Sequence, residues 1–201
     1  MRIQGSNFGN FSLMTVLRAE RLLAISEEHE EDNDPLLGCS IVLLATALDQ
    51  SLSTTLKKLC LEYDSDEQWA LPNPADDLQD KSLWYRLKTT PEILHINPFK
   101  LNFRSEHVSY LRDVVTGRNS LLHIEEEPIS FDFEFPDGDE IPSKIIVTLT
   151  REQQKELFKD TAWKQVTIAE VRRGIRAVTV YLHALAGDPD AEVKLLTCAT
   201  V

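Results

Sequence analysis

The stretch CSIVLLATALDQSL, residues 39–52, is apolar on nearly all sides when it is drawn as a helix. A helix of that kind is typical of a protein interior, where every face meets another element. The neighbouring residues extend the predicted helix from about Leu37 to Tyr63. Its most apolar part, IVLLATAL at 41–48, is far too short to cross a bilayer. We therefore expect a mainly α-helical protein with this helix at its centre and no membrane span.

Further helices are predicted on both sides of the central one. Apolar spacing predicts a first helix from about Leu13 to Glu28. After an acidic loop at 64–80, residues 81–87 are expected to form a short helix. Thr90 is the expected N-cap of another short helix, because proline follows it at the first helical position. Finally, Ser105 is expected to cap a longer helix that reaches about Ile124.

The C-terminal part of the chain combines a predicted β-hairpin with a predicted helix. Residues 129–135, ISFDFEF, alternate apolar and acidic side chains, and SKIIVTLT at 143–150 forms a second strand after turn-forming residues. Thr167–Glu170 has the spacing of a capping box, and the apolar residues behind it predict an amphipathic helix to about Gly187. We expect the tail after Pro189 to be loose.

The length of 201 residues and the hydrophobic content of 42% indicate one compact unit with a substantial core. Residues 1–127 are expected to form the helical bundle, on which residues 128–201 pack as the hairpin and C-terminal helix. Cys39, Cys60 and Cys198 lack the paired spacing of zinc or redox sites. The N-terminus, MRIQGSNFGNF, lacks the apolar core of a signal peptide. We therefore expect a cytoplasmic protein with reduced thiols and with no metal or cofactor.

The chain carries a net charge of −12 at pH 7, which argues against a general affinity for nucleic acid. The charge is uneven, however, because residues 26–35 carry six acids and no base. Residues 81–118 carry seven bases against three acids. This basic excess is either a chance grouping of solvated charges or part of a surface for an anionic ligand. If that ligand is RNA, Arg104 and Arg112 of the basic segment are its candidate contacts.

The basic segment leads into GRNSLLH at 117–123, where an arginine, an asparagine and a histidine lie within six residues. On a helical wheel Arg118 falls near the middle of an apolar stripe, whereas Asn119 and His123 share another face. An arginine in an apolar stripe is costly to bury unless an anion meets it. Asn119 is spaced to hydrogen-bond the His123 ring and fix its tautomer.

Two interpretations of this group remain open on physical grounds. Arg118 could pair with Asp49, which lies among apolar neighbours in the central helix, and simply tie two helices together. Alternatively, Arg118 and His123 could bind or cleave a phosphodiester. Neutral imidazole can take a proton from a ribose 2′-hydroxyl, and a guanidinium can neutralise the charge that builds on the phosphate. Such a site cleaves RNA without a metal.

The stretch Arg118-Asn119-Ser120-Leu121-Leu122-His123 resembles the Arg-Asn-x-x-x-His form of the motif that marks HEPN domains. These domains are small helical bundles in bacterial and archaeal toxin–antitoxin, phage-defence and RNA-processing proteins. The order of the predicted helices is also similar: the motif ends a helix, and a long apolar helix that carries an acid, Asp49, precedes it. The resemblance covers roughly residues 13–125 and implies a HEPN-like up-and-down helical bundle.

The resemblance also implies a function. It implies that the chain forms a homodimer, in which two motifs share one cleft and cleave RNA without metal, leaving a 2′,3′-cyclic phosphate. By that resemblance His123 is the general acid–base and Arg118 binds the phosphate. Asn119 is the orienting partner, and Asp49 is a supporting acid. The implied protein is a toxin or phage-defence effector, with RNA as its substrate and an antitoxin or another regulatory protein as a partner.

Two other functions stay open in the sequence. Three glutamates at 125–127 lie close after His123 and would repel RNA, which suits a non-catalytic HEPN-like module that binds a protein or nucleotide. In that module Arg118 would be neutralised by Asp49, whereas in the nuclease Arg118 and His123 would line a solvent-open cleft. The third function is that of a helical regulator resembling the mannitol-repressor family, although nothing marks a DNA-reading helix.

Overall fold

A computed structural model of the chain describes residues 9–28, 35–65, 75–122 and 166–196. This part of the chain is mainly α-helical and contains no strand, which confirms the predicted fold class at that level. The β-hairpin predicted at 129–150 lies outside the described residues, as does the boundary at 127–128. The elements in chain order are α1 (Gly9–Glu28), α2 (Pro35–Ser65), α3 (Asp76–Gln79), α4 (Leu83–Thr89), the 3-10 helix η1 (Thr90–Ile93), α5 (Glu106–Leu122), α7 (Ile168–Leu185) and α8 (Pro189–Leu196).

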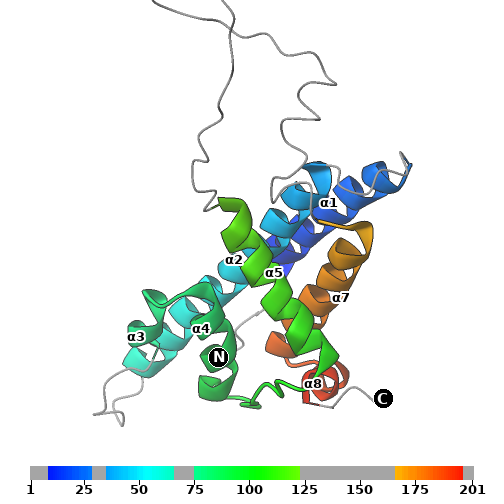
Figure 1. The fold of residues 1–201 in the computed structure, drawn as a ribbon. Helices are drawn as coiled ribbons and strands as arrows, with labels where there is room; N and C mark the ends of the chain where they lie inside the picture. The colour runs from blue at the N-terminus through cyan, green and yellow to red at the C-terminus, as the bar shows by residue number, and fades with distance from the viewer. Residues whose placement is uncertain (1–8, 29–34, 66–74, 123–165, 197–201) are drawn as a thin grey trace, which may run out of the picture.

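Helix α2 is the centre of the bundle, and α1, α5 and α7 pack around it (Figure 1). Leu44, Leu48 and Leu52 of α2 are completely buried, and burying each such leucine contributes roughly 1.5–3 kcal/mol. By length and composition Pro35–Leu61 could cross a membrane, but half of its most apolar window is buried inside the bundle. A central core helix has the same properties, so this feature carries no argument for a membrane.

Helices α2, α5 and α7 approach one another closely at Gly174 of α7. A Cβ atom at this position would lie 2.9 Å from Val114 Cγ2 of α5 and 3.1 Å from Leu44 Cδ1 of α2. A larger residue would therefore push the helices apart. Buried residues of α7, such as Val171 and Val178, belong to the same hydrophobic core as those of α1, α2 and α5.

Helix α7 has defined signals at both of its ends. At the start, the Thr167 hydroxyl accepts a hydrogen bond from the Glu170 backbone N–H, and the Glu170 carboxylate accepts one from the Thr167 backbone N–H. This is the capping box that the sequence predicts. At the end, Gly187 adopts a positive φ of 87°, which glycine accepts without strain, and the chain turns there.

The prediction of a loose tail after Pro189 is wrong for the described residues, because α8 extends from Pro189 to Leu196. Side chains before α5 hold it: the Ser105 hydroxyl donates to the Lys194 carbonyl at 2.8 Å, and the Asn102 amide donates to the Leu196 carbonyl at 2.8 Å. Ala191 and Leu195 complete the attachment by packing into the core. These long-range contacts order a segment that is short on its own.

The segment between α2 and α5 also differs from its prediction in two places. Within the predicted loop at 64–80, residues 76–79 form α3. Thr90 is not an N-cap, because its backbone is helical, with φ −54° and ψ −43°, and continues α4 directly into η1. An N-cap needs a non-helical backbone to turn its side chain toward the free N–H groups. The Thr90 hydroxyl is buried without a hydrogen-bond partner among the described residues.

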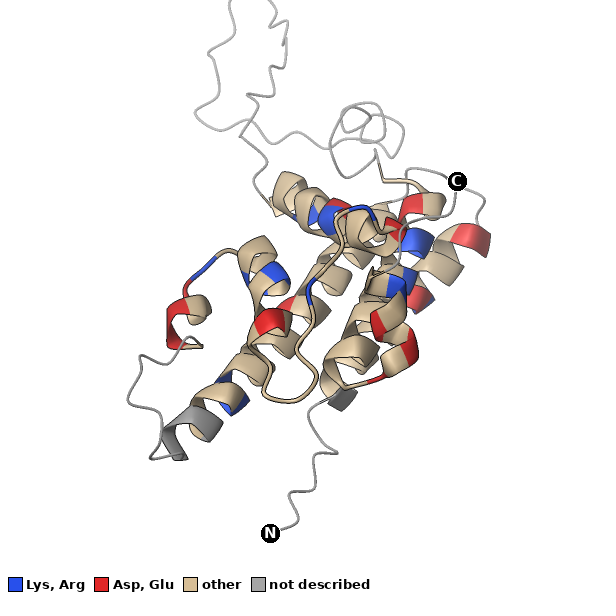
Figure 2. Cartoon of the chain, turned by 90° about the horizontal axis from the view of Figure 1, so that it is seen from below, with Lys and Arg blue, Asp and Glu red and all other residues tan. Residues whose placement is uncertain are grey.

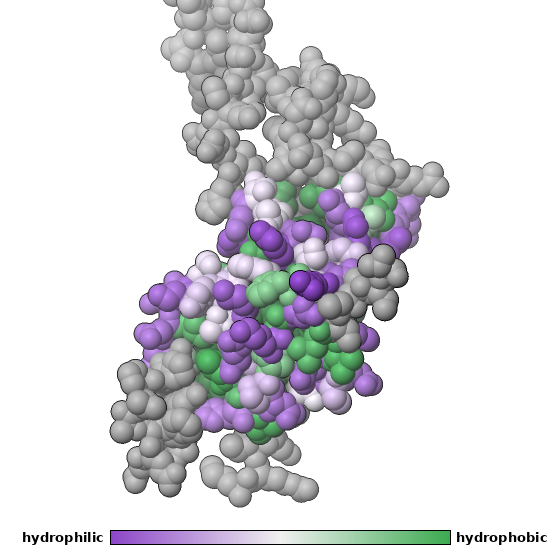
Figure 3. Space-filling view, turned by 60° about the horizontal axis from the view of Figure 1, so that its bottom comes forward, coloured by the Kyte–Doolittle hydropathy of each residue, from purple (hydrophilic) through white to green (hydrophobic). Residues whose placement is uncertain are grey.

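In the view of Figure 2, no large region of the described part carries charge of one sign. Acidic and basic residues are interspersed over the helices (Figure 2), and hydrophobic patches lie between hydrophilic ones on the face shown in Figure 3. The basic excess of the segment 81–118 therefore forms no broad basic face in the view of Figure 2, and any basic site within it is a local group of side chains.

Candidate functional site

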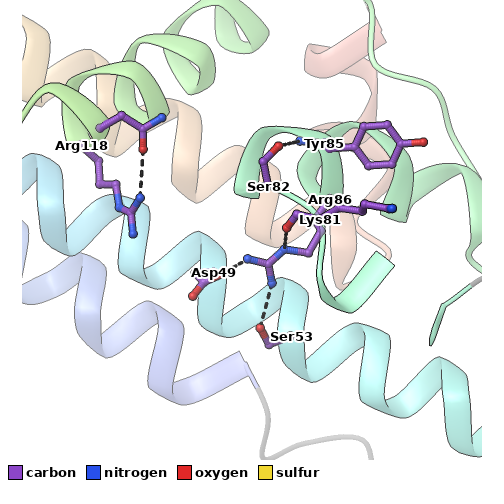
Figure 4. Close-up of polar contacts among 8 residues, drawn as sticks. Asp49, Ser53, Lys81, Ser82, Tyr85, Arg86 and Arg118 are labelled. Atoms are coloured by element: carbon purple, nitrogen blue, oxygen red, sulfur yellow. Dashed lines mark hydrogen bonds and ion pairs between the residues drawn. The ribbon is translucent and has the colours of Figure 1, made fainter. Parts of the chain in front are cut away.

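Residues 117–122 of the motif segment form the C-terminal end of α5. Of the apolar stripe that the spacing predicts, Leu111, Val115 and Leu121 face the core, but Leu122 is 50% exposed. Arg118 is half-buried and Asn119 is exposed. The Arg118 Nη1 atom donates a hydrogen bond of 2.9 Å to Asn119 Oδ1 (Figure 4). Asn119 therefore orients the guanidinium of Arg118. His123 follows α5 directly and lies outside the described residues, so its predicted bond to Asn119 stays a prediction.

Asp49 of α2 pairs with Arg86 of α4 and not with Arg118. The Arg86 guanidinium makes three contacts: its Nη2 atom donates to the Asp49 carboxylate, its Nη1 to Ser53 Oγ at 3.1 Å, and its Nε to the Lys81 carbonyl at 3.1 Å. The Arg86 side chain is 12% exposed and that of Asp49 is 50% exposed. Arg86 is thus the side chain that ties α4 to α2, the structural role that Arg118 was a candidate for.

A pocket of about 270 Å³ lies where α2, α4 and α5 meet, and we call it the α2–α4–α5 pocket. Both Arg118 and Arg86 line it, and Figure 4 shows them directed toward the same stretch of α2, where Asp49 lies. Its lining residues are Ala45, Thr46, Asp49, Lys81, Ser82, Leu83, Arg86 and Arg118. The fold therefore brings together Arg118 and Asp49, two of the predicted site residues, and adds two basic residues.

The electrostatics of the α2–α4–α5 pocket favour an anion. Three basic side chains, Lys81, Arg86 and Arg118, line it against one carboxylate, that of Asp49, which is already bound to Arg86. No carboxylate among the described residues forms an ion pair with Lys81 or Arg118. In a chain with a net charge of −12, a pocket with a positive balance is a local exception, and it suits a phosphate or carboxylate ligand.

The predicted RNA contacts Arg104 and Arg112 are both exposed, and neither lines this pocket. Arg104 precedes α5, whereas Arg118 lies in its last turn, so the two are about 20 Å apart along the helix direction. Arg112 lies six residues before Arg118, which places it roughly 120° away around the helix. The structure does not bring these two arginines to the candidate site.

Sequence reasoning missed Lys81 and Arg86 as site residues. The available signal was helical spacing: Arg86 lies three residues after Leu83, so the two residues share one face of α4, and both line the pocket. Lys81 could not be placed from spacing alone, because it precedes α4 and its position depends on how α4 docks on α2.

A second pocket of about 260 Å³ lies between α5 and α7 and is lined by Tyr110, Asp113, Glu170 and Arg173, among others. Arg173 lies over the Tyr110 ring at 5.3 Å, and Tyr110 donates to the Glu106 carboxylate. The hydrogen bond to Glu106 is the main reason why the pKa of Tyr110 is raised. Two carboxylates, Asp113 and Glu170, line this pocket against one cation, Arg173, so its charge does not favour an anionic ligand.

Metal sites and similarities to known proteins add no further assignment. Among the described residues, no group of three or more His, Cys, Asp or Glu side chains could hold a metal ion. Comparisons of the chain with protein-family models, with curated proteins and with solved structures find no match. The residues that bear on function are therefore those of the α2–α4–α5 pocket and of the motif beside it.

Proposed function

We propose that the protein is a metal-independent endoribonuclease of the HEPN type, which acts as a homodimer with Arg118 and His123 of each subunit in a shared cleft. The observation that carries this proposal is Arg118 itself. It is half-buried beside a pocket with a positive charge balance, and no carboxylate of the described residues neutralises it. A partly desolvated cation without an anionic partner is costly, and an incoming phosphate removes that cost.

The proposed chemistry assigns one task to each motif residue. Neutral His123 removes the proton of a ribose 2′-hydroxyl, whose oxygen attacks the adjacent phosphorus. The bond from phosphorus to the 5′-oxygen then breaks, and the leaving oxygen takes a proton from a protonated His123 imidazole in the shared cleft. This leaves a 2′,3′-cyclic phosphate on one product and a 5′-hydroxyl on the other. Arg118 neutralises the charge that builds on the phosphate oxygens.

Asn119 and Asp49 have supporting tasks in this proposal. The Asn119 carbonyl oxygen accepts from Arg118, so its amide N–H groups are left for a ring nitrogen of His123. Asp49 acts indirectly, because its carboxylate holds the Arg86 guanidinium in place in the α2–α4–α5 pocket. In the cell, we propose a cytoplasmic toxin or phage-defence effector that an antitoxin or a similar protein restrains.

A non-catalytic HEPN-like binding module is the second candidate. The observation in its favour is the run of glutamates at 125–127, separated from His123 by Ile124 alone, in a chain whose net charge is already −12. These charges weaken the association with RNA. The same pocket would then take the phosphate of a nucleotide or a carboxylate of a partner protein, and His123 would carry out no proton transfer.

The two candidates are separated by the cleavage of a labelled structured RNA by the wild type, His123→Ala and Arg118→Ala. The nuclease requires that both substitutions abolish cleavage, while His95→Ala and Arg21→Ala, which replace exposed residues elsewhere, retain it. Cleavage that survives in purified His123→Ala would assign the activity to another group or to a contaminant. RNA binding without any cleavage by the wild type would favour the binding module.

A further inference from the structure

We propose that the α2–α4–α5 pocket is a phosphate-binding subsite in which Lys81 and Arg86 join Arg118 as ligands of one phosphate group of the RNA strand. The proposal rests on the proposed function in one respect, namely that the phosphate belongs to RNA. Neither Lys81 nor Arg86 is part of the Arg-Asn-x-x-x-His pattern. The subsite would explain why a basic segment precedes the motif in an otherwise acidic chain.

Arg86 is held in place before any ligand arrives. Its guanidinium has five N–H donors in a rigid plane, of which three are engaged by Asp49, Ser53 and the Lys81 carbonyl. Two donors therefore remain on a side chain whose position is already fixed. A fixed donor loses little conformational entropy when it binds, so it contributes more to affinity than a mobile one.

Lys81 and Arg118 supply charge that is not used elsewhere in the described structure. Arg118 bonds only to the neutral Asn119 side chain, and Lys81 forms no ion pair with a described residue. The Lys81 backbone is nevertheless held, because its carbonyl accepts from Arg86 and its N–H donates to the Leu78 carbonyl at 3.1 Å. A basic side chain on an anchored backbone at the pocket rim is suited to closing over an anion.

The size of the pocket limits what the subsite can take. Drug-sized ligands occupy pockets of about 300–1,000 Å³, and this pocket holds about 270 Å³. It therefore fits a phosphate with part of its ribose rather than a whole nucleotide. Besides the cations, its hydrogen-bonding groups are the Asp49 carboxylate and the hydroxyls of Thr46 and Ser82. None of its lining residues is aromatic, so no base can stack there. Recognition by this pocket is consequently independent of base identity.

The test uses a fluorescent 2′-O-methyl RNA decamer, which cannot be cut because its 2′-oxygen carries no proton, and measures binding by anisotropy. We expect Lys81→Gln and Arg86→Lys each to weaken binding about tenfold, the loss typical of one charge-assisted contact. Lys88→Gln removes a charge from the same helix outside the pocket and should change the affinity less than twofold. Inorganic phosphate should compete with the decamer on the wild type.

Salt dependence distinguishes a phosphate contact from a general effect on folding. For single strands the slope of log K against log salt is about −0.7 for each phosphate that cations neutralise. Because Arg86 and Arg118 still contact the phosphate, Lys81→Gln should make the slope less negative by at most about 0.7. Binding by Lys81→Gln with the affinity and slope of the wild type would overturn the subsite. Competition by poly-glutamate but not by phosphate would overturn the ligand class. RNA cleavage is measured separately. If the wild type cleaves RNA and Lys81→Gln changes neither binding nor cleavage, the subsite alone is refuted. If the wild type binds phosphate in this pocket but cleaves no RNA, the nuclease alone is refuted.

Discussion

Arg86 and Arg118 line the same pocket, yet the structure gives them opposite roles in stability. The Arg86 side chain is 12% exposed and bonds to Asp49, to Ser53 and to the Lys81 carbonyl. Arg118 is half-buried and bonds only to its neighbour Asn119. We therefore expect Arg86→Ala to destabilise the fold and Arg118→Ala to leave the free energy of unfolding nearly unchanged.

The magnitude follows from the exposure of the two partners. A buried hydrogen bond to a charged group contributes about 1.5–3 kcal/mol, and an exposed ion pair about 0.2–1 kcal/mol. The Asp49 side chain is 50% exposed, so solvent screens its part of the interaction. We expect a loss of about 2 kcal/mol for Arg86→Ala, which lowers the Tm of a domain of this size by about 4–8 °C. Arg118→Ala should stay within about 0.5 kcal/mol of the wild type.

Urea unfolding followed by circular dichroism measures both effects, and a double-mutant cycle with Asp49→Asn apportions them. The cycle should give a coupling energy of about 1 kcal/mol between Arg86 and Asp49 and about zero between Arg118 and Asp49. The reasoning is refuted if Arg118→Ala loses as much stability as Arg86→Ala and couples to Asp49. Arg118 would then be the structural tie, and its role as a phosphate ligand would have no basis.

Three further predictions concern the core and use the same unfolding assay. Gly174→Ala should lower the free energy of unfolding by about 1–2 kcal/mol, because the added Cβ meets Val114 Cγ2 at 2.9 Å. This clash outweighs the gain in helix propensity. A variant more stable than the wild type would show that α5 and α7 can move apart without cost. Thr90→Val removes a buried hydroxyl without a described partner and should be neutral or stabilising by up to about 1 kcal/mol, so a clear loss would reveal a hidden hydrogen bond. The hydroxyl of the buried Tyr181 donates to the Leu87 carbonyl at 2.8 Å, so Tyr181→Phe should cost about 1 kcal/mol at pH 7. Burial raises the pKa of Tyr181 well above its usual value, so the folded state keeps a proton that the unfolded state releases near pH 10. Stability should therefore fall as the pH rises above about 10, and Tyr181→Phe should lose less over that range than the wild type does.

The parts of the fold that follow from local rules could be predicted from the sequence. The apolar stretch at 39–52 forms the core of α2, and the capping box at Thr167–Glu170 begins α7. Each of these depends on side chains that act on their own helix, so spacing alone is sufficient. The helix α8 was missed because its order comes from distant residues, Ser105 and Asn102, which bond to its carbonyl groups.

The candidate site shows the same division. Arg118 could be singled out because its place in an apolar stripe requires an anion, which is a property of α5 alone. Which carboxylate or cation lies beside it depends on how α4 and α5 dock on α2. That docking pairs Asp49 with Arg86 and brings Lys81 to the rim of the α2–α4–α5 pocket. The local sequence predicts neither of these two results. The local sequence indicates that a charged residue needs a partner, but the packing of the helices decides which residue that partner is.

The first experiment on the function itself should follow one labelled RNA in EDTA with the purified wild type and determine the chemistry of the new ends. We expect cleavage that EDTA does not inhibit, products that end in a 2′,3′-cyclic phosphate, and no cut at a site where the single ribose before the scissile bond is 2′-deoxy. Intact RNA after prolonged incubation with excess protein, or cuts that persist at the 2′-deoxy position, would contradict a nuclease built on Arg118 and His123.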